Sequence, residues 1–282
     1  MSKVGVVGCG LMGNGIAQVS AQAGYDVVVR EISRELLDKG IKRIERMLTG
    51  ALEKGKITEK DKEETLSKIT PTLDINDLTD CDLIIEAVTE DIDLKKRLFE
   101  ELDEICPADT IFTSNTSSIK ISLMAEKLKR RDKVLGLHFF NPVPIMKLVE
   151  IVKPDTAGEE AYVTCKEFVE SLGKVPITCK DTTGFVVNRL LVPYLLDAIR
   201  TLEEGIATAE DIDTGMKLGC GHPMGPLTLL DFVGLDTTLA ISHIMFKEWG
   251  LPQYSPPKLL EDKVRAGEVG RKSGKGFYDY SR

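Results

Sequence analysis

The stretch Lys3–Gln18, KVGVVGCGLMGNGIAQ, joins a valine-rich run to a glycine-rich turn and then to a segment with helical spacing. The turn carries the pattern GxGxxG, formed by Gly8, Gly10 and Gly13. In a strand–turn–helix unit, the first glycine permits the tight turn and the second lets the backbone approach a pyrophosphate. The third lets the helix pack closely on the strand. The stretch therefore predicts a dinucleotide-binding turn, with a purely structural glycine turn as the alternative.

Two further features favour a dinucleotide. The helix after the turn begins with Leu11 and Met12, and the N–H groups and dipole of a helix N-terminus attract phosphates. Glu31 stands 21 residues after the second glycine, directly after a second valine-rich run at 26–30. A carboxylate there accepts hydrogen bonds from ribose hydroxyls and repels a 2′-phosphate, which favours NAD. The adjacent Arg30 can accommodate a 2′-phosphate, so NADP stays an alternative.

Length and composition indicate a globular protein of about two domains. The 282 residues carry 37 Lys and Arg against 45 Asp and Glu, a net charge of −8. An acidic chain without a basic stripe argues against nucleic acid as the main partner. The six cysteines and three histidines show no metal-ligand spacing, so we expect reduced thiols and no metal. No apolar run approaches about 20 residues and no secretory signal is visible, which predicts a cytoplasmic protein without a membrane-spanning helix.

The first half of the chain alternates strand-like and helix-like segments. Strand-like runs are expected at 4–7, 26–30, 82–88, 110–113, 133–139, 148–152 and 175–179. A charged helical hairpin is expected at about 33–68. Apolar β-branched runs between helices are typical of a parallel sheet covered on both faces. We therefore predict that residues 1–183 form a doubly wound α/β domain of the Rossmann type.

The pattern becomes helical after Gly184. Apolar residues recur at helical spacing over 185–204, 208–218 and 227–247, and the one later strand is expected at Phe277–Tyr280. We predict an all-α domain at 184–282. Its apolar helices exceed what one thin layer can bury, which predicts a homodimer or a larger homo-oligomer.

Polar residues follow several of the expected strands, where open α/β sheets bind their ligands. His138 lies at the end of one strand, and Ser117 lies in SNTSS, 114–118, after another. Glu150 follows twelve residues after His138 on the next strand-like run, where it can pair with the imidazole. Asn188 opens the first helix of the second domain. Each residue also has a structural interpretation, as a satisfied core histidine, a helix cap, a strand-end charge or a surface amide.

The whole chain resembles the short-chain (S)-3-hydroxyacyl-CoA dehydrogenases, most closely the bacterial 3-hydroxybutyryl-CoA dehydrogenases of butyrate and butanol metabolism. The resemblance rests on motifs that occur in order: GCGLMGNGIAQ, SNTSS, HFFNPVPIMKLVE, DTTGFVVNRLLVPYL, EDIDTGMKLGCGHPMGP, DFVGLDT and GRKSGKGFYDY. Such a series is more specific than any single motif.

The resemblance implies that the chain interconverts (S)-3-hydroxybutyryl-CoA and acetoacetyl-CoA with NAD. His138 matches the family's general acid and base, and Glu150 the carboxylate that orients it. Ser117 and Asn188 match groups that hydrogen-bond the substrate. The positions that match NAD contacts in the family are Glu90, Lys95, Ser117, Asn141 and Lys272.

Lys54 matches a lysine of the hairpin that approaches CoA in the family, although a solvated charged helix face explains it equally well. The second domain matches the family's dimerisation domain. Two other functions stay open: a dehydrogenase of a free hydroxy acid such as a sugar acid, and an NAD(H)-binding protein without turnover.

Overall fold

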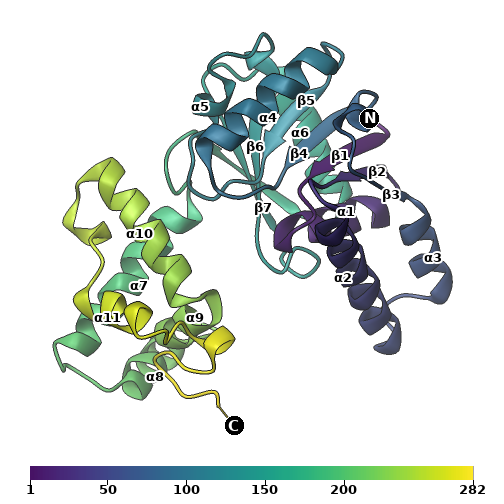
Figure 1. Cartoon of the computed structure of the whole chain (residues 1–282). Coiled ribbons are helices and arrows are strands. Elements are labelled where there is room, and N and C mark those ends of the chain that lie inside the picture. The colour runs from purple at the N-terminus through teal and green to yellow at the C-terminus, as the bar shows by residue number, and fades with distance from the viewer. Residues whose placement is uncertain (282) are drawn as a thin grey trace. The chain divides into compact units, whose positions relative to one another are not determined.

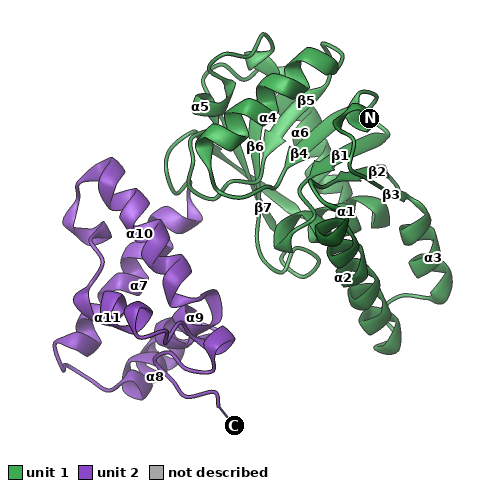
Figure 2. Cartoon of the chain, in the orientation of Figure 1, with its two compact units in different colours: residues 1–185 green, residues 186–282 purple. Residues whose placement is uncertain are grey.

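The structure is a computed structural model that describes residues 1–281. The chain divides into two compact units, Met1–Phe185 and a second unit from Val186 onward (Figures 1 and 2). The first unit holds the sheet, and the second is helical. The division lies two residues beyond the predicted boundary at 183/184.

The first unit is built on an eight-stranded sheet with the order β3-β2-β1-β4-β5-β6-β7-β8. The strands are β1 Lys3–Val7, β2 Asp26–Arg30, β3 Ile69–Thr72, β4 Leu83–Glu86, β5 Ile111–Ser114, β6 Val134–Phe139, β7 Leu148–Lys153 and β8 Val175–Lys180. β1 pairs in parallel with β2 on one side and β4 on the other. The strand order therefore reverses between β1 and β4, and this switch point is where doubly wound sheets bind ligands.

Helices cover both faces of this sheet. They are α1 Leu11–Gln22, α2 Arg34–Glu53, α3 Glu59–Ser67, α4 Ile92–Ile105, α5 Ile121–Ala125 and α6 Glu159–Ser171, with 3₁₀ turns η1 Ile75–Leu78 and η2 Arg131–Lys133. Alternate residues of one strand enter different cores, as the pleat requires. Val27 and Val29 of β2 belong to the core cluster that includes residues of α1, α2 and α6, whereas Val28 belongs to the one that includes residues of α4 and α5. The doubly wound architecture predicted from the sequence is confirmed.

Two features of the sheet were not predicted. β3 is an additional strand at the sheet edge, where Pro71 is tolerated because an edge strand has an unpaired side. β6 and β7 pair antiparallel, with Gly136 opposite Val152. Their connection, residues 140–147, contains no crossover helix, so the chain turns back beside β6 instead of crossing the sheet.

The second unit contains α7 Val187–Glu203, α8 Ala209–Cys220, α9 Pro226–Val233, α10 Leu235–Trp249 and α11 Lys258–Arg265, with 3₁₀ turns η3 Pro252–Tyr254 and η4 Arg271–Ser273. The single helix predicted at 227–247 is wrong, because Gly234 at φ +103 separates α9 from α10. The strand predicted at Phe277–Tyr280 is also wrong. The N–H groups of Phe277 and Tyr278 donate to the buried carboxylate of Asp231, at 2.8 and 2.9 Å, instead of to another strand.

Within residues 1–281 no single helix is long and apolar enough to cross a membrane. The α9–α10 pair meets the length and composition test only when both helices are taken together, and it is bent by 95°.

Candidate active site

The turn after β1 needs two of its three glycines for reasons internal to the protein. Gly8 has φ +97, and a Cβ there would lie 2.6 Å from the carbonyl oxygen of Ala87. A Cβ on Gly13 would lie 1.8 Å from the carbonyl oxygen of Gly8. A Cβ on Gly10 would meet no atom within 4 Å. Gly10 therefore keeps open a space that the fold itself does not use, as expected where a pyrophosphate approaches.

The start of α1 is also suited to a phosphate. Gly10 is its N-cap, and no side chain bonds to the cap position. Leu11 and Met12 lie in the first turn of α1. Their backbone N–H groups have no partner within the helix, and no capping side chain accepts a hydrogen bond there. The residues present thus fit the diphosphate of a dinucleotide.

Glu31, which directly follows β2, forms a hydrogen bond with the backbone of the glycine turn. Its Oε2 accepts the N–H of Cys9 at 2.8 Å, and its Oε1 accepts the N–H of Ile32 at 2.8 Å. A carboxylate has about four lone-pair positions, so each oxygen can still accept a ribose hydroxyl. Burial, followed by the charge of Glu31, raises the pKa of the Cys9 thiol to about 12, which makes this cysteine a poor nucleophile.

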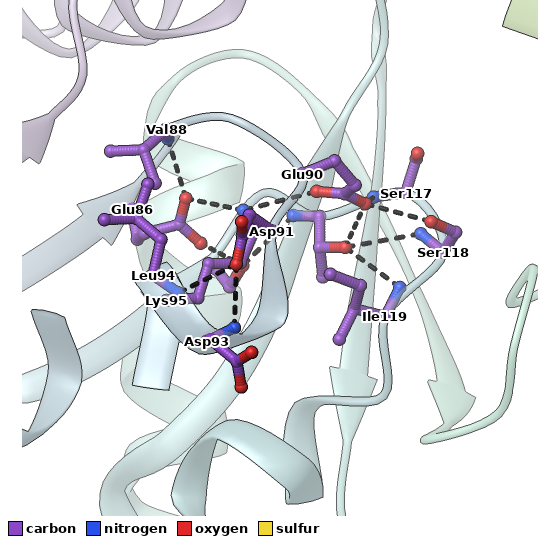
Figure 3. Close-up of polar contacts among 12 residues, drawn as sticks. Glu86, Val88, Glu90, Asp91, Asp93, Leu94, Lys95, Ser117, Ser118 and Ile119 are labelled. Atoms are coloured by element: carbon purple, nitrogen blue, oxygen red, sulfur yellow. Dashed lines mark hydrogen bonds and ion pairs between the residues drawn. The ribbon is translucent and has the colours of Figure 1, made fainter. Parts of the chain in front are cut away.

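A polar cluster lies where β4 and β5 end (Figure 3). Glu86, the last residue of β4, is fully buried and accepts the ammonium of Lys95 at 2.6 Å. Lys95, also buried, makes a second ion pair with Glu90 at 3.3 Å. β4 and β5 are parallel, so their carboxyl ends meet at one edge of the sheet. The cluster therefore lies at the edge where a ligand binds.

Glu90 accepts hydrogen bonds from three residues of the SNTSS segment. Its Oε1 accepts the Thr116 hydroxyl, the Ser117 N–H at 3.1 Å and the Ser118 hydroxyl at 3.0 Å. Burial alone would raise the pKa of Glu90, but the Lys95 charge and these hydroxyls outweigh it and hold the pKa below its ordinary value. In Figure 3 the Ser117 side chain points away from Glu90. Glu90 therefore fixes the backbone of Ser117.

His138 and Glu150 form a buried pair. The antiparallel register of β6 and β7 places them directly opposite each other. His138 Nδ1 lies 2.6 Å from Glu150 Oε2, and the Glu150 side chain has no exposed surface. The rings of Phe140 and Phe185 pack on the imidazole, with centroids 4.5 and 5.5 Å away. This contact orients the ring through Nδ1 and turns Nε2 away from the carboxylate.

Phe185, whose ring packs on His138, has an uncommon backbone conformation. It has φ +46, although it is not a glycine, and its side chain is buried. A bulky residue in this left-handed region is strained, and such strain persists only where the surrounding structure holds it.

The loop between β6 and β7 carries Asn141, which is exposed and joined to Pro142 by a cis peptide bond. Lys174 forms hydrogen bonds with the backbone of this loop. Its Nζ donates to the carbonyls of Val143 and Met146 at 2.6 and 2.7 Å, and burial lowers its pKa. The loop that connects His138 with Glu150 is therefore tied to the turn after α6.

The remaining predicted site residues lie at the end of α2 and in the second unit. Lys54 is exposed at the C-terminal end of α2. Asn188 lies in the first turn of α7, and Lys272 lies in η4, where it pairs with Asp236 at 2.6 Å. These last two belong to the second unit, and their roles stay predictions.

Sequence reasoning missed Glu86. Its signal was present, because an acidic residue ends the otherwise apolar run Leu83–Ile85. A charge in such a buried position must be paired. Among residues 1–281, no group of three or more His, Cys, Asp or Glu side chains is placed to hold a metal ion.

An imidazole held by a buried carboxylate, at the carboxyl edge of a sheet that starts with a dinucleotide turn, fits a nicotinamide-dependent dehydrogenase. The particular family follows from comparison with known sequences. Residues 3–182 match the family model described as "3-hydroxyacyl-CoA dehydrogenase, NAD binding domain", and residues 184–280 match that of its C-terminal domain. The chain belongs to the 3-hydroxyacyl-CoA dehydrogenase family, and NAD is its cofactor.

Individual members of this family are similar to the chain over nearly its full length. The chain is 50% identical to a 3-hydroxybutyryl-CoA dehydrogenase of Mycobacterium tuberculosis over 282 residues, 99% of each protein. It is 44% identical to one from Clostridioides difficile over 280 residues, 99% of this chain and 100% of that protein. The crystal structure of (S)-3-hydroxybutyryl-CoA dehydrogenase from Ralstonia eutropha superimposes with a TM-score of 0.96 at 44% identity, covering 100% of both chains.

Proposed function

We propose that this chain catalyses the NAD-dependent interconversion of (S)-3-hydroxybutyryl-CoA and acetoacetyl-CoA. The observation that carries the proposal is the 2.6 Å contact between His138 Nδ1 and the fully buried Glu150 carboxylate. A proton-transfer group at the carboxyl edge of an NAD-binding sheet is what oxidation of an alcohol requires. The relatives named above, which match the chain from end to end, support this substrate.

His138 carries the proton in this proposal. NAD, when bound, would supply the acceptor for the hydride that leaves C3 of the substrate. His138 Nε2 takes the proton of the 3-hydroxyl group during oxidation and returns it during reduction. An imidazole suits both directions because it can hold or release a proton near neutral pH. Glu150 fixes the tautomer through Nδ1 and stabilises the imidazolium.

The other predicted residues bind and orient. Ser117 and Asn188 donate hydrogen bonds to substrate oxygens, where they stabilise the charge that develops on the C3 oxygen during reduction. Glu31 accepts the ribose hydroxyls of the adenosine half of NAD. The turn residues Gly8, Gly10, Leu11, Met12 and Gly13 cradle the diphosphate. The residues proposed to contact the remainder of NAD are Glu90, Lys95, Ser117, Asn141 and Lys272.

The helix α2 is proposed to meet the CoA part of the substrate. Lys42, Arg46 and Lys54 are exposed along it and at its end. Cations suit the phosphate groups of CoA. A Lys54→Ala variant should raise the KM for acetoacetyl-CoA several-fold and leave that for NADH unchanged. An unchanged KM for acetoacetyl-CoA would remove Lys54 from the substrate site.

We also propose a homodimer or larger homo-oligomer formed through the second unit, in the cytoplasm. Large apolar side chains are exposed there, including Leu190 at 70%, Ile206 at 68% and Leu218 at 81%. Exposed apolar surface of this kind marks interaction sites when it is contiguous. Light scattering of the purified protein tests the mass, and a monomer at micromolar concentration would contradict the proposal.

A spectrophotometric assay at 340 nm tests the reaction itself. Acetoacetyl-CoA and free acetoacetate are supplied in parallel, each with NADH and with NADPH. We expect rapid oxidation of NADH with the thioester only. Equal turnover of the free acid would favour the hydroxy-acid alternative. NADH binding without oxidation of any substrate would favour the non-catalytic alternative.

The same assay with His138→Gln tests the proton carrier. General acid–base catalysis typically contributes about 10²–10⁴-fold to a rate, so kcat should fall by that order. Circular dichroism must show that the variant is folded. Unchanged turnover in a folded variant would rule out His138 as the acid and base. The place of the reaction in short-chain fatty acid or butyrate metabolism is part of the same proposal.

A further inference from the structure

Glu86 has an unusual environment for a carboxylate. It ends β4 with no exposed surface, and its strand is paired on both sides. Its Oε1 accepts the Val88 N–H at 2.7 Å and the Lys95 ammonium at 2.6 Å. Its Oε2 accepts the hydroxyl of Ser114, the last residue of β5. One side chain thus joins the loop after β4, the helix α4 and the end of β5. Figure 3 shows Glu86 with Val88 and Lys95.

The contacts continue from Glu86 to the ligand edge. Lys95, only 1% exposed, lies between Glu86 and Glu90. Glu90 has 35% of its side chain exposed and holds the Ser117 backbone at 3.1 Å. The sequence of contacts is therefore Glu86–Lys95–Glu90–Ser117, from the core outward. Exposure of the acidic side chains increases along this series, from none at Glu86 to 35% at Glu90.

Stability alone does not explain this arrangement. A buried ion pair gains little over apolar residues of the same volume, because the loss of hydration offsets the attraction between the charges. Near the other end of α4, Asp103 forms a second nearly buried pair, with Arg130 at 2.6 Å, and each side chain is 8% exposed. That pair lies away from the ligand edge, and Arg130 also donates to the backbone carbonyls of Asp103 and Cys106. It provides a matched comparison for Glu86.

We propose that Glu86 is a positioning residue for cofactor binding. Its charge holds Lys95, and Lys95 holds Glu90 and the SNTSS segment in the arrangement that accepts the nicotinamide half of NAD. Glu31 and the glycine turn lie on the β1–β2 side of the switch point, where they are proposed to bind the adenosine and diphosphate groups. β4 and β5 lie on the other side, so we assign the nicotinamide half of NAD to the SNTSS segment. The inference rests on the proposed roles of Glu90, Lys95 and Ser117.

Substitution Glu86→Gln keeps the shape and removes the charge. Lys95 then has Glu90 as its one acidic partner and draws it away from Thr116 and Ser117. We expect the Kd for NADH, measured by fluorescence titration without substrate, to rise at least 10-fold. The KM for NADH should rise in parallel, while kcat at saturating NADH stays within about 3-fold of wild type. The Tm should fall as well.

Asp103→Asn is the control that separates positioning from stability. It breaks a nearly buried pair on the same helix, so its Tm should also fall, but its Kd for NADH should stay within 2-fold of wild type. Glu86→Gln with a lowered Tm and an unchanged Kd would overturn the proposal. So would an equal loss of NADH affinity in Asp103→Asn, because NADH binding would then follow stability alone.

Ser114→Ala gives a second test that does not change any charge. It removes the hydrogen bond that Ser114 donates to Glu86 and the one that its hydroxyl accepts from the Thr116 N–H at 3.1 Å, so we expect the Kd for NADH to rise about 3-fold with a small fall in Tm. An unchanged Kd there would contradict the proposal even if Glu86→Gln does not fold. Because the titration contains no acyl-CoA, it separates this inference from the substrate assignment. Wild-type protein that binds NADH but does not reduce acetoacetyl-CoA would overturn the substrate and leave the test of Glu86 intact.

Discussion

His138 and Glu150 face each other across β6 and β7, the one antiparallel pair in a sheet whose other neighbouring strands are parallel. Directly opposite residues of such a pair have Cβ atoms about 5 Å apart, close enough for an imidazole and a carboxylate to meet. The observed contact of 2.6 Å uses this register. The chain reverses direction after β6, and the backbone pairing of β6 with β7 therefore places the Glu150 carboxylate beside the His138 imidazole.

Replacing Glu150 with Gln tests this relationship. The amide keeps the side chain's shape but does not favour the protonated imidazole, so kcat for acetoacetyl-CoA reduction should fall by about 10²-fold or more. The KM values for both substrates should change little. Glu159→Gln is the control, because Glu159 pairs with Lys153 at the end of the same strand and is 72% exposed. If kcat of Glu150→Gln stays within 2-fold of wild type, the carboxylate does not assist the histidine.

The two directions of the reaction should respond oppositely to pH. Oxidation needs neutral His138 as a base, so its rate should rise with increasing pH. Reduction needs the imidazolium, so its rate should fall as the pH increases. Initial rates at saturating substrates between pH 5.5 and 9 measure this. Flat profiles in both directions would count against His138, provided that presteady-state bursts exclude product release as the slow step.

Glu90 should make folding sensitive to acid. Its folded-state pKa is lowered from the ordinary 4.5, so the unfolded chain binds its proton first as the pH falls. The stabilising contribution is complete above about pH 4.5 and is lost as the pH falls through the lower folded value. Urea unfolding at pH 7 and at pH 3.5 should therefore show a smaller loss of stability in Glu90→Gln than in wild type. Glu100→Gln, which alters an exposed pair with Lys127, is the control. Equal losses in wild type and Glu90→Gln would contradict the coupling.

Local patterns predicted those parts of the fold and site that depend on neighbouring residues. The β1–turn–α1 unit follows from glycine spacing, because steric demands at Gly8 and Gly13 act within a few residues. Two adjacent strand-like runs predicted that Glu150 can pair with His138, whereas the antiparallel register that brings them together was not predicted. The split into an α/β part and a helical part follows from the change of hydrophobic period.

The missed features depend on contacts that are distant in sequence. Helical spacing continues through Gly234, but the chain turns there, so the pattern predicted one helix where two exist. The alternating residues at Phe277–Tyr280 suggest a strand, yet their N–H groups bond to Asp231, more than 40 residues earlier. Glu86 had a local signal, an acidic residue at the end of an apolar run, but that signal does not identify its partner Lys95, which lies on another element, α4.

Gly10 and Gly13 should respond differently to the same substitution, because the Cβ of Ala meets open space at one and backbone at the other. Gly10→Ala should keep the wild-type Tm within a few degrees, since its φ of −70 suits any residue. It should raise the Kd for NADH at least 10-fold, because the added methyl group occupies the space proposed for the diphosphate. Gly13→Ala should lower the Tm strongly, since a Cβ 1.8 Å from the Gly8 oxygen forces α1 away from the turn.

Gly50→Ala is the matched control for both, because Gly50 lies within α2 and a Cβ there meets no atom within 4 Å. Alanine is favoured over glycine inside a helix by about 1 kcal/mol, so this variant should be as stable as wild type or slightly more so, with the same Kd for NADH. Differential scanning fluorimetry and NADH titration measure all three proteins. If Gly10→Ala binds NADH like wild type, the diphosphate does not lie over Gly10, and the assignment of the glycine turn as the phosphate site is wrong.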